Sequence, residues 1–360
     1  MDADKLMNGV LRQHPRGRDV AEIMAAALAA VEPRAAVRRV LRKDGHTVVA
    51  GGQSYELSAG GRVFVIGAGK ACAPMAEAAL EALGDVVYAG VVIVKDGHLG
   101  AAGESIGPIK LFEAAHPVPD ERGIAAAARL AALLKEATTD DLVLALVSGG
   151  GSALLTLPSP GLTLEDIQAL TAVLLRCGAT INDINALRKH CTRLGGGGIA
   201  SLASPARTVA LIISDVVGSP LETIASGPTA PDPTTYADAW RVVERYELGD
   251  QLPANVIEHL RRGRAGEVAE SPKASDAIWS QVHNYIVADN RTAAEAAIAA
   301  GRERGFDAVL LTTFLEGEAR EVGRVAAAIG CEMRARVAAG GSSPLLCVLG
   351  GETTVTLGGG

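Results

Sequence analysis

Residues 141–152 read DLVLALVSGGGS, an apolar run that ends abruptly in a loop of serine and glycine. Four other segments have the same form, an apolar run followed at once by glycine or polar residues; they are residues 62–70, 86–97, 109–120 and 208–215. Strands that are apolar throughout are buried on both faces, as they are in parallel sheets. Helical stretches separate the runs, so we predict an α/β fold built on a doubly wound, Rossmann-like sheet.

The later part of the chain predicts a second, smaller α/β domain. The strand-like runs NYIVAD, AVLLTT and PLLCVLG begin at residues 284, 308 and 344, after a polar, proline-containing connection. We assign residues 1–250 to the larger Rossmann-like domain and residues 275–360 to the smaller one. Only three glycines end the chain after the last strand and its polar tail, with no covering helix. We therefore expect the smaller domain to be incomplete at its C-terminus and the chain to be part of a longer protein.

Composition narrows the class of protein. The 360 residues are 48% hydrophobic and 21% charged, which is enough to bury the core of a globular protein. The net charge of −7 and the lack of long Lys/Arg blocks give no basic face for nucleic acid. No apolar run reaches the length of a membrane span, and the polar N-terminus does not read as a secretory signal. Five scattered cysteines without CxxC spacing fit a reducing cytoplasm and no zinc site.

Two glycine-rich loops are candidates for binding an anion. In doubly wound sheets, ligands bind at the carboxyl ends of the strands, where these loops lie. Glycines allow close approach of the backbone, and Lys70 adds a positive charge. The first loop, Gly67–Lys70, is not a Walker A motif, because Ala71 follows the lysine. It is not a dinucleotide fingerprint either, because Cys72 occupies the place of the last glycine. The alternative for the first loop is an ordinary βα turn with an exposed lysine. The alternative for the second loop, Ser148–Ser152, is a flexible linker. The nucleotide- or phosphate-binding residues we predict here are Gly67, Gly69, Ser148, Gly149, Gly150, Gly151 and Ser152.

Acidic and basic residues near these loops suggest further roles. Asp215 ends an apolar run and, with Asp232, could hold Mg²⁺, although either could instead cap a local turn. Arg188, Lys189 and His190 precede a run of four glycines, and two cations beside such a loop could bind a substrate carboxylate. For any single one of them the alternative is a solvated helix face. The lone histidines His98 and His116 are more typical of hydrogen-bonded scaffold.

Six strings occur in order: GAGKA, FEAAHPVPD, LVSGGGSALL, INALRKH, IISDVVGSPLETIASGPTAPDPT and LGGETTV. Together they resemble the class II glycerate kinases, or glycerate 2-kinases, whose members often carry the label putative hydroxypyruvate reductase. The resemblance runs from about Asp19 to the end of the chain. Three departures occur: Ser219 replaces an expected acid, Gly195 replaces a frequent lysine, and the chain ends before the GGRNQE string with its arginine.

The resemblance implies a cytoplasmic kinase of carbohydrate metabolism that uses ATP and Mg²⁺ to phosphorylate the 2-hydroxyl of glycerate, in a cleft between two domains. It implies that Lys70 is catalytic and that Asp215 and Glu352 line that cleft, Glu352 on the nucleotide side. We assign Asp215 both catalytic and metal-binding roles, Asp232 a metal-binding role, and Lys189, His190 and Ser226 to glycerate.

Two other functions stay open from the sequence. One is reduction of hydroxypyruvate by NAD(P)H, against which the broken glycine fingerprint counts. The other is a sensor that binds sugar phosphates without catalysis. The partners expected are glycerate and a nucleotide, with no nucleic acid and no membrane, and a homodimer is compatible with the sequence.

Overall fold

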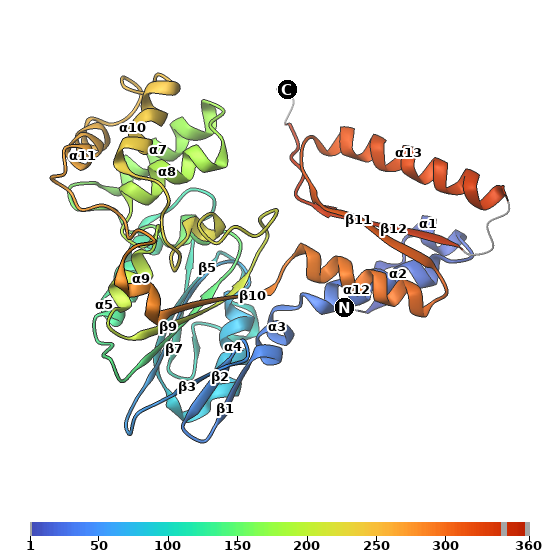
Figure 1. Cartoon of the computed structure of the whole chain (residues 1–360), viewed down its shortest axis with the longest axis horizontal. Coiled ribbons are helices and arrows are strands. Elements are labelled where there is room, and N and C mark those ends of the chain that lie inside the picture. The colour runs from blue at the N-terminus through green and yellow to red at the C-terminus, as the bar shows by residue number, and fades with distance from the viewer. Residues whose placement is uncertain (1, 340–343, 357–360) are drawn as a thin grey trace. The chain divides into compact units, whose positions relative to one another are not determined.

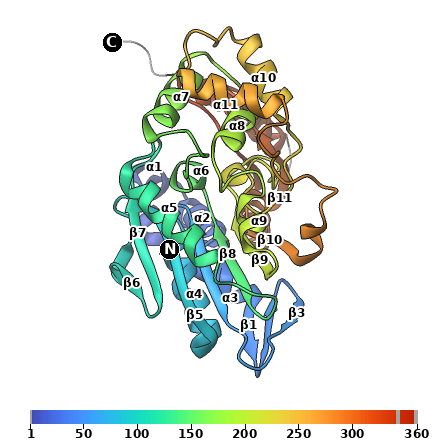
Figure 2. The same cartoon turned by 90° about the vertical axis from the view of Figure 1, so that its left-hand side faces the viewer.

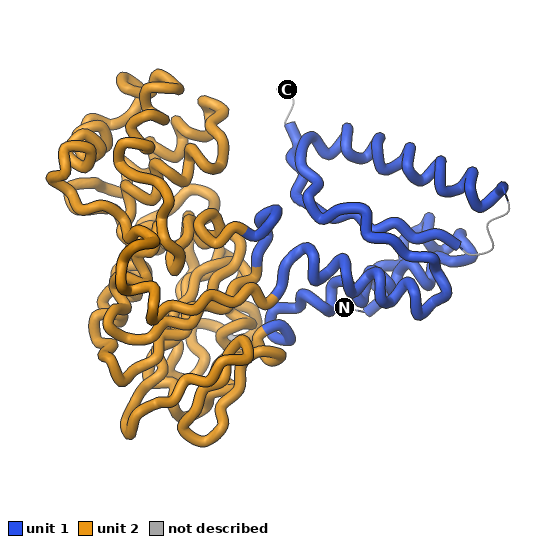
Figure 3. Tube along the Cα trace, viewed as in Figure 1, with its two compact units in different colours: residues 1–36, 214–219, 288–360 blue, residues 37–213, 220–287 orange. Residues whose placement is uncertain are grey.

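The computed structural model describes residues 2–339 and 344–356, which form two compact units (Figure 3). Unit 2 comprises residues 37–213 and 220–287, and unit 1 comprises residues 1–36, 214–219 and 288–360. The N-terminal residues thus cluster with the C-terminal unit, whereas the sequence placed them in the larger domain. Residues 357–360, where the expectation of an incomplete end falls, lie outside the described residues.

Unit 2 is built on a seven-stranded sheet with the order β10-β9-β8-β4-β5-β7-β6. Strand β4 pairs in parallel with β5 and β8, β5 with β7, and β8 with β9, while β6 is antiparallel to β7. The predicted α/β fold with a mainly parallel sheet is confirmed. The strands are β4 (Val63–Ala68), β5 (Val87–Lys95), β6 (Ser105–Ile106), β7 (Ile109–Ala114), β8 (Leu142–Val147), β9 (Arg207–Ile213) and β10 (Val282–Ala288).

Helices cover both faces of this sheet, which is why its central strands are apolar throughout. Every residue of β4 and β8 is buried. Figure 1 shows α4 (Cys72–Leu83) on one face and α5 (Glu121–Leu134) with α9 (Gly198–Ala203) on the other. A three-stranded antiparallel meander flanks the sheet, formed by β1 (Leu41–Asp44), β2 (Thr47–Ala50) and β3 (Gln53–Glu56).

The strand order places a topological switch between β4 and β8. From β4 the chain proceeds outward to β5 and β7, and it then returns to build β8 and β9 on the other side of β4. The loops that leave the carboxyl ends of β4 and β8 therefore turn toward opposite faces of the sheet. Such a point opens a crevice that is the usual ligand site of doubly wound sheets.

A helical layer lies beyond the carboxyl ends of these strands (Figure 2). It shares one hydrophobic core, to which α8 contributes Ile184, Leu187 and Cys191. The side chain of Thr180 caps the start of α8 by accepting from the backbone of Asp183 at 3.2 Å. The layer consists of α7 (Leu164–Arg176), α8 (Ile181–Cys191), α10 (Tyr236–Arg245) and α11 (Ala254–Arg264), with the short α6 (Gly151–Leu154) between it and the sheet.

Unit 1 is a smaller α/β assembly. Its two strands, β11 (Asp307–Leu315) and β12 (Leu345–Gly351), pair in parallel. Ile23 of α2 and Phe306 share a small core with Ala297 and Ala300. The helices are α1 (Gly9–Gln13), α2 (Gly17–Ala30), α12 (Asn290–Glu303) and α13 (Ala319–Ala338), and α3 (Pro33–Val40) crosses the boundary between the units. No helix among the described residues has the length and apolarity of a membrane span.

Asp141 ties the amino ends of β4 and β8 together. Its buried carboxylate accepts from the backbone and guanidinium of Arg62, at 2.8 to 3.1 Å, and from the backbone and hydroxyl of Thr138, both at 2.9 Å. Burial alone would raise the pKa of Asp141, but these donors outweigh it and lower the pKa to about 2. The ionised carboxylate therefore stabilises the start of both central strands.

Replacing Asp141 by Asn should lower the free energy of unfolding at pH 7 by roughly 2 kcal/mol, because the charge-assisted hydrogen bonds are lost. The pKa of Asp141 is lower in the folded protein than in the unfolded chain. The native protein should therefore exceed Asp141→Asn in free energy of unfolding by the full amount above about pH 4, and this difference should disappear as the pH falls toward 2. Urea unfolding at pH 7, 4 and 3 measures this. The exposed neighbour Asp140, changed to Asn, is the matched control and should have little effect.

Candidate active site

The candidate site lies where the loops after β4 and β8 meet. Gly69 has a φ of +142° and packs so closely on Ser148 that any Cβ would overlap the serine hydroxyl. Lys70 donates its backbone N–H to the Gly149 carbonyl at 3.0 Å, and Ala71 donates to Ser148 Oγ at 3.0 Å. The two glycine-rich loops are therefore fastened to each other.

Two backbone donors in the middle of the Ser148–Ser152 loop have no acceptor among the described residues. Among the described residues, the backbone N–H groups of Gly149 and Gly150 have no hydrogen-bond partner. Gly150 is left-handed, with a φ of +88°, and it precedes the first turn of α6. Consecutive free N–H groups in this geometry form an anion-binding concavity. The loop is thus an ordered element that presents donors, which argues against the alternative of a flexible linker.

Gly150 also brings two side chains to one point. A Cβ built on it would lie 3.1 Å from His116 Nε2 and 3.4 Å from Lys70 Cε. Lys70 is exposed, and its ammonium forms no ion pair with any described residue. His116, which the sequence favoured as scaffold, therefore lies beside the predicted catalytic lysine.

Other predicted glycines serve packing. Gly67 lies within β4, where a side chain would meet the Leu146 carbonyl of β8. Gly151 is buried against Ala225. Both glycines let neighbouring backbones approach closely, and their predicted contact with a nucleotide or phosphate stays a prediction.

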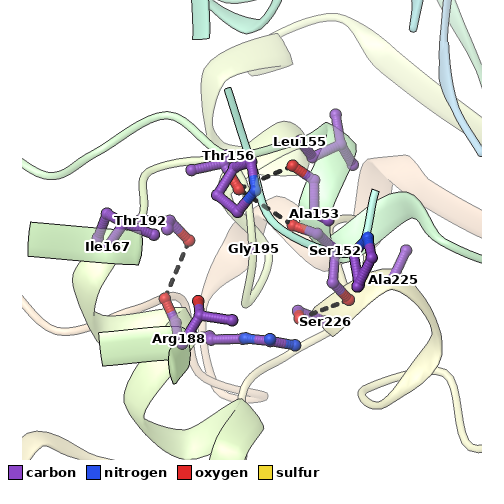
Figure 4. Close-up of a pocket in the computed structure, with 13 residues that line it drawn as sticks. Ser152, Ala153, Leu155, Thr156, Ile167, Arg188, Thr192, Gly195, Ala225 and Ser226 are labelled. Carbon is purple, nitrogen blue, oxygen red and sulfur yellow. Dashed lines mark hydrogen bonds between the residues drawn. The ribbon is translucent and has the colours of Figure 1, made fainter. Parts of the chain in front are cut away.

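A small pocket with apolar walls and a few polar groups adjoins the loop on the side of Ser152 (Figure 4). Its walls include Ser152, Ser226 and Arg188, and its volume is about 20 Å³. Ala225 and Ser226 both have positive φ, 50° and 62°, which is strained for residues other than glycine. Backbone hydrogen bonds hold this turn, from Gly196 to the Ser226 carbonyl at 2.8 Å and from Gly197 to that of Gly227 at 2.7 Å.

Arg188 is half-buried in this pocket, and no described residue accepts a hydrogen bond or forms an ion pair with its guanidinium. Burial lowers the pKa of Arg188 from its ordinary value, since the charged form loses water. Nearby, Asn185 is 3% exposed, and its Nδ2 has no hydrogen-bond partner. Its Oδ1 accepts from Ser226 Oγ at 3.0 Å, and Ser226 is also hydrogen-bonded to Ser152 Oγ at 2.9 Å.

Lys189 and Asp232 form a buried ion pair, with 3.3 Å between Nζ and Oδ1. Asp232 also accepts from the backbone and hydroxyl of Thr234 at 2.9 and 2.7 Å and from Ser271 at 2.7 Å. Burial would raise the pKa of Asp232, but Lys189 and these hydrogen bonds lower it overall. The carboxylate has all its partners within the protein. The two side chains therefore form a buried ion pair, while the metal-binding role of Asp232 and the glycerate-binding role of Lys189 stay predictions.

His190 also has partners within the protein, and its predicted contact with substrate stays a prediction. Its ring is buried, with Nδ1 2.7 Å from the Ala186 carbonyl and Nε2 3.2 Å from Glu270 Oε2, and it packs edge-on against Tyr236. Both ring nitrogens are thus occupied.

Asp215 and Glu352 belong to unit 1 and are described separately from this cluster. Asp215 directly follows β9, is exposed, and forms no ion pair or side-chain hydrogen bond with a described residue. Glu352, just after β12, is exposed as well. The described residues contain no group of three or more His, Cys, Asp or Glu that could by itself hold a metal ion.

Comparison with known proteins places this geometry in a family. Residues 19–261 match a family described as a domain of unknown function, DUF4147. A glycerate 2-kinase of Pyrococcus horikoshii is 40% identical over 335 residues, which cover 93% of this chain and 73% of that protein. The chain belongs to the glycerate kinase family. The resemblance inferred from six sequence strings is therefore confirmed.

Two further relatives support the same family assignment. The crystal structure of a glycerate kinase from Thermotoga maritima superposes with a TM-score of 0.77 at 35% identity, covering 94% of this chain and 74% of that one. A putative hydroxypyruvate reductase of Agrobacterium vitis is 44% identical over 301 residues, 83% of this chain and 65% of that protein. The chain thus spans about two thirds to three quarters of the length of these members of the glycerate kinase family.

The structural role of the Lys189–Asp232 pair can be tested with a double-mutant cycle. Asp232→Asn should lower the free energy of unfolding by roughly 3 kcal/mol, because it leaves the Lys189 ammonium buried without a counter-charge. Adding Lys189→Met should recover part of the loss, with a coupling of roughly 1–3 kcal/mol. Urea unfolding of the four proteins measures this.

The metal-ligand alternative makes a different prediction for the same proteins. A magnesium site at Asp232 would make added Mg²⁺ raise the Tm of the native protein but not that of Asp232→Asn. We expect equal Mg²⁺ effects on both, and additive losses in the cycle would contradict the ion-pair assignment.

Proposed function

We propose that the protein is an ATP-dependent glycerate 2-kinase that transfers the γ-phosphoryl group of ATP to the 2-hydroxyl of glycerate. The observation that carries the proposal is the convergence, at the switch point of the sheet, of an unpaired lysine and two unpaired backbone N–H groups. The names of the Pyrococcus and Thermotoga relatives support it.

The chain's own residues would act mainly by position and charge, as is general for phosphoryl transfer. The N–H groups of Gly149 and Gly150 would donate to phosphoryl oxygens, and the Lys70 ammonium would neutralise the charge that develops on them. Because the two loops are hydrogen-bonded to each other, these donors would be held in place before the substrates bind, so little reorganisation is needed at the moment of transfer.

Mg²⁺ would neutralise phosphate charge when bound, and the chemistry of Asp215 fits a modest part in holding it. Mg²⁺ is commonly bound by one or two carboxylates together with substrate phosphates rather than by a full protein cage. Asp215 offers one exposed carboxylate without a competing partner, at the carboxyl end of β9. Glu352 would contact the nucleotide, as the family resemblance implies.

Lys70→Ala should lower kcat by roughly 100- to 1000-fold and leave both KM values within a few-fold of normal, because the ammonium would act on charge that develops in the transition state. Phosphorus NMR of a reaction with ATP, Mg²⁺ and glycerate measures the rate and identifies the product. Lys110→Ala, an exposed lysine at the amino end of β7, is the control. A Lys70→Ala protein of normal kcat would contradict the assignment.

Asp215→Asn should raise the half-saturating concentration of Mg²⁺ by roughly tenfold, about 1.4 kcal/mol, since the amide keeps the shape of the side chain but loses its charge. Initial rates titrated with Mg²⁺ at saturating ATP provide the measurement. Asp250→Asn, another exposed aspartate, is the matched control. Identical titrations for all three proteins would show that Asp215 does not contribute to the metal site.

The reductase alternative is tested with the same preparation. The name of the Agrobacterium relative keeps it in view, although Cys72 is buried and in contact with Ser148 at the place where a dinucleotide fingerprint has its last glycine. Consumption of NADH or NADPH with hydroxypyruvate, without phosphorylation of glycerate, would favour it. Binding of sugar phosphates with neither reaction would favour the sensor.

A further inference from the structure

We propose that Arg188, supported by Asn185, binds the carboxylate of the acceptor substrate and thereby restricts the enzyme to hydroxy acids. The proposal rests on the kinase function given above and extends it to the residue that would select the acceptor. Three features carry it: the uncompensated charge of Arg188 in the small pocket, the unsatisfied amide of Asn185 next to the pocket residue Ser226, and the size and place of the cavity.

The first feature is the charge of Arg188. A guanidinium does not lose its proton in proteins, so it cannot relieve the cost of burial by becoming neutral. Its neighbours on α8 show the usual solution, because Lys189 is paired with Asp232 and His190 with Glu270. Arg188 alone of the three has no acidic partner among the described residues, although it is half-buried. An anion that enters the pocket would supply the missing counter-charge.

The second feature is the buried amide of Asn185. Its Nδ2 donates to no described residue, and an unsatisfied buried donor is unfavourable because it has given up its hydrogen bond to water. Exchanging the amide oxygen and nitrogen would pair the nitrogen with Ser226 and leave the oxygen unsatisfied instead, so one polar atom lacks a partner in either orientation. Asn185 and Arg188 lie three residues apart on α8 and so share one stripe of the helix. Arg188 lines the pocket, as does Thr192, which follows the last residue of α8.

The third feature is the size and position of the cavity. A volume of about 20 Å³ admits one or two groups the size of water, which suits a carboxylate and excludes a nucleotide base. Ser152 lines the cavity and lies two residues from Gly150, so its backbone is within about 7 Å of the proposed phosphoryl site. In a 2-hydroxy acid, the carbon that bears the hydroxyl is bonded directly to the carboxylate. A carboxylate held by Arg188 would therefore direct the adjacent hydroxyl toward Gly150 and Lys70.

The experiment compares glycerate with its amide, 2,3-dihydroxypropanamide, which has nearly the same shape and no charge. The native enzyme should prefer glycerate by at least about 100-fold in kcat/KM, since a charge-assisted bidentate contact contributes roughly 3 kcal/mol. Arg188→Gln should lose most of this preference, through a lower kcat/KM for glycerate and a nearly unchanged value for the amide. Arg188→Lys keeps the positive charge but not the guanidinium that can donate two parallel hydrogen bonds, so its preference for glycerate over the amide should be intermediate. Arg176→Gln, at an exposed arginine of α7, should behave as the native enzyme.

A merely structural arginine would affect both substrates alike and would lower stability. We expect Arg188→Gln to unfold at the same or a higher urea concentration than the native protein, because an unpaired charge is removed. An undiminished preference for glycerate in Arg188→Gln, or an equal loss for both substrates, would overturn the proposal.

Failure of the underlying kinase function would be recognised separately. If the native protein phosphorylates neither compound, calorimetric titration with glycerate alone still decides the role of the pocket. Weaker binding to Arg188→Gln than to the native protein and Arg176→Gln would support a carboxylate site. Equal binding, or no binding to any of the three, would overturn it.

Discussion

The contact between Gly69 and Ser148 is the constraint on which the rest of the site depends. It lies at the one place where neighbouring parallel strands send their loops to opposite faces of the sheet. No side chain fits at Gly69, and the Ser148 hydroxyl is occupied by the backbone of Ala71 and the thiol of Cys72. Because the two loops cannot separate without breaking these contacts, Lys70 and the free donors of Gly149 and Gly150 are fixed on one scaffold. At the opposite ends of the same strands, Asp141 fixes where β4 and β8 begin.

Helix α8 shows how one segment can serve stability and binding at once. Its apolar residues enter the core of the helical layer, Lys189 pairs with Asp232 before α10, and His190 pairs with Glu270 after α11. These contacts stabilise the helix strongly enough that a neighbouring cation can stay unpaired. Arg188 and the amide of Asn185 are each unfavourable in the protein alone. Groups of this kind are usually kept where a ligand completes their hydrogen bonds.

Much of the fold was predictable because it depends on local pattern. Apolar strands that stop at glycine-rich loops indicate a parallel sheet with an anion site at its edge, and six short strings identified the family. The partners of the α8 cations were not predictable, since Asp232 and Glu270 are 43 and 80 residues away from Lys189 and His190 in sequence. Asn185 and Arg188 each follow an apolar core residue, Ile184 or Leu187, and this offset of about 100° around the helix was the available signal that Arg188 faces away from that core. Nor does any local pattern show that residues 1–36 join the C-terminal unit, because that association forms across nearly the whole chain.

The net charge of the chain explains why such local devices are needed. A chain with a net charge of −7 repels anions through its overall field, so affinity for an anionic ligand has to arise from contacts at short range. Exposed charges would be screened by salt beyond about 10 Å, whereas a half-buried guanidinium and ordered backbone donors act where water is excluded. Exposed cations such as Lys110 and Arg176 also form no ion pair with a described residue, so the lack of an acidic partner does not by itself mark a site. What distinguishes Lys70 and Arg188 is their surroundings, since Lys70 lies beside free backbone donors and Arg188 is half-buried in a small pocket. The proposed phosphoryl and carboxylate sites therefore share one physical basis, a positive charge placed where the fold adds further donors or reduces contact with water.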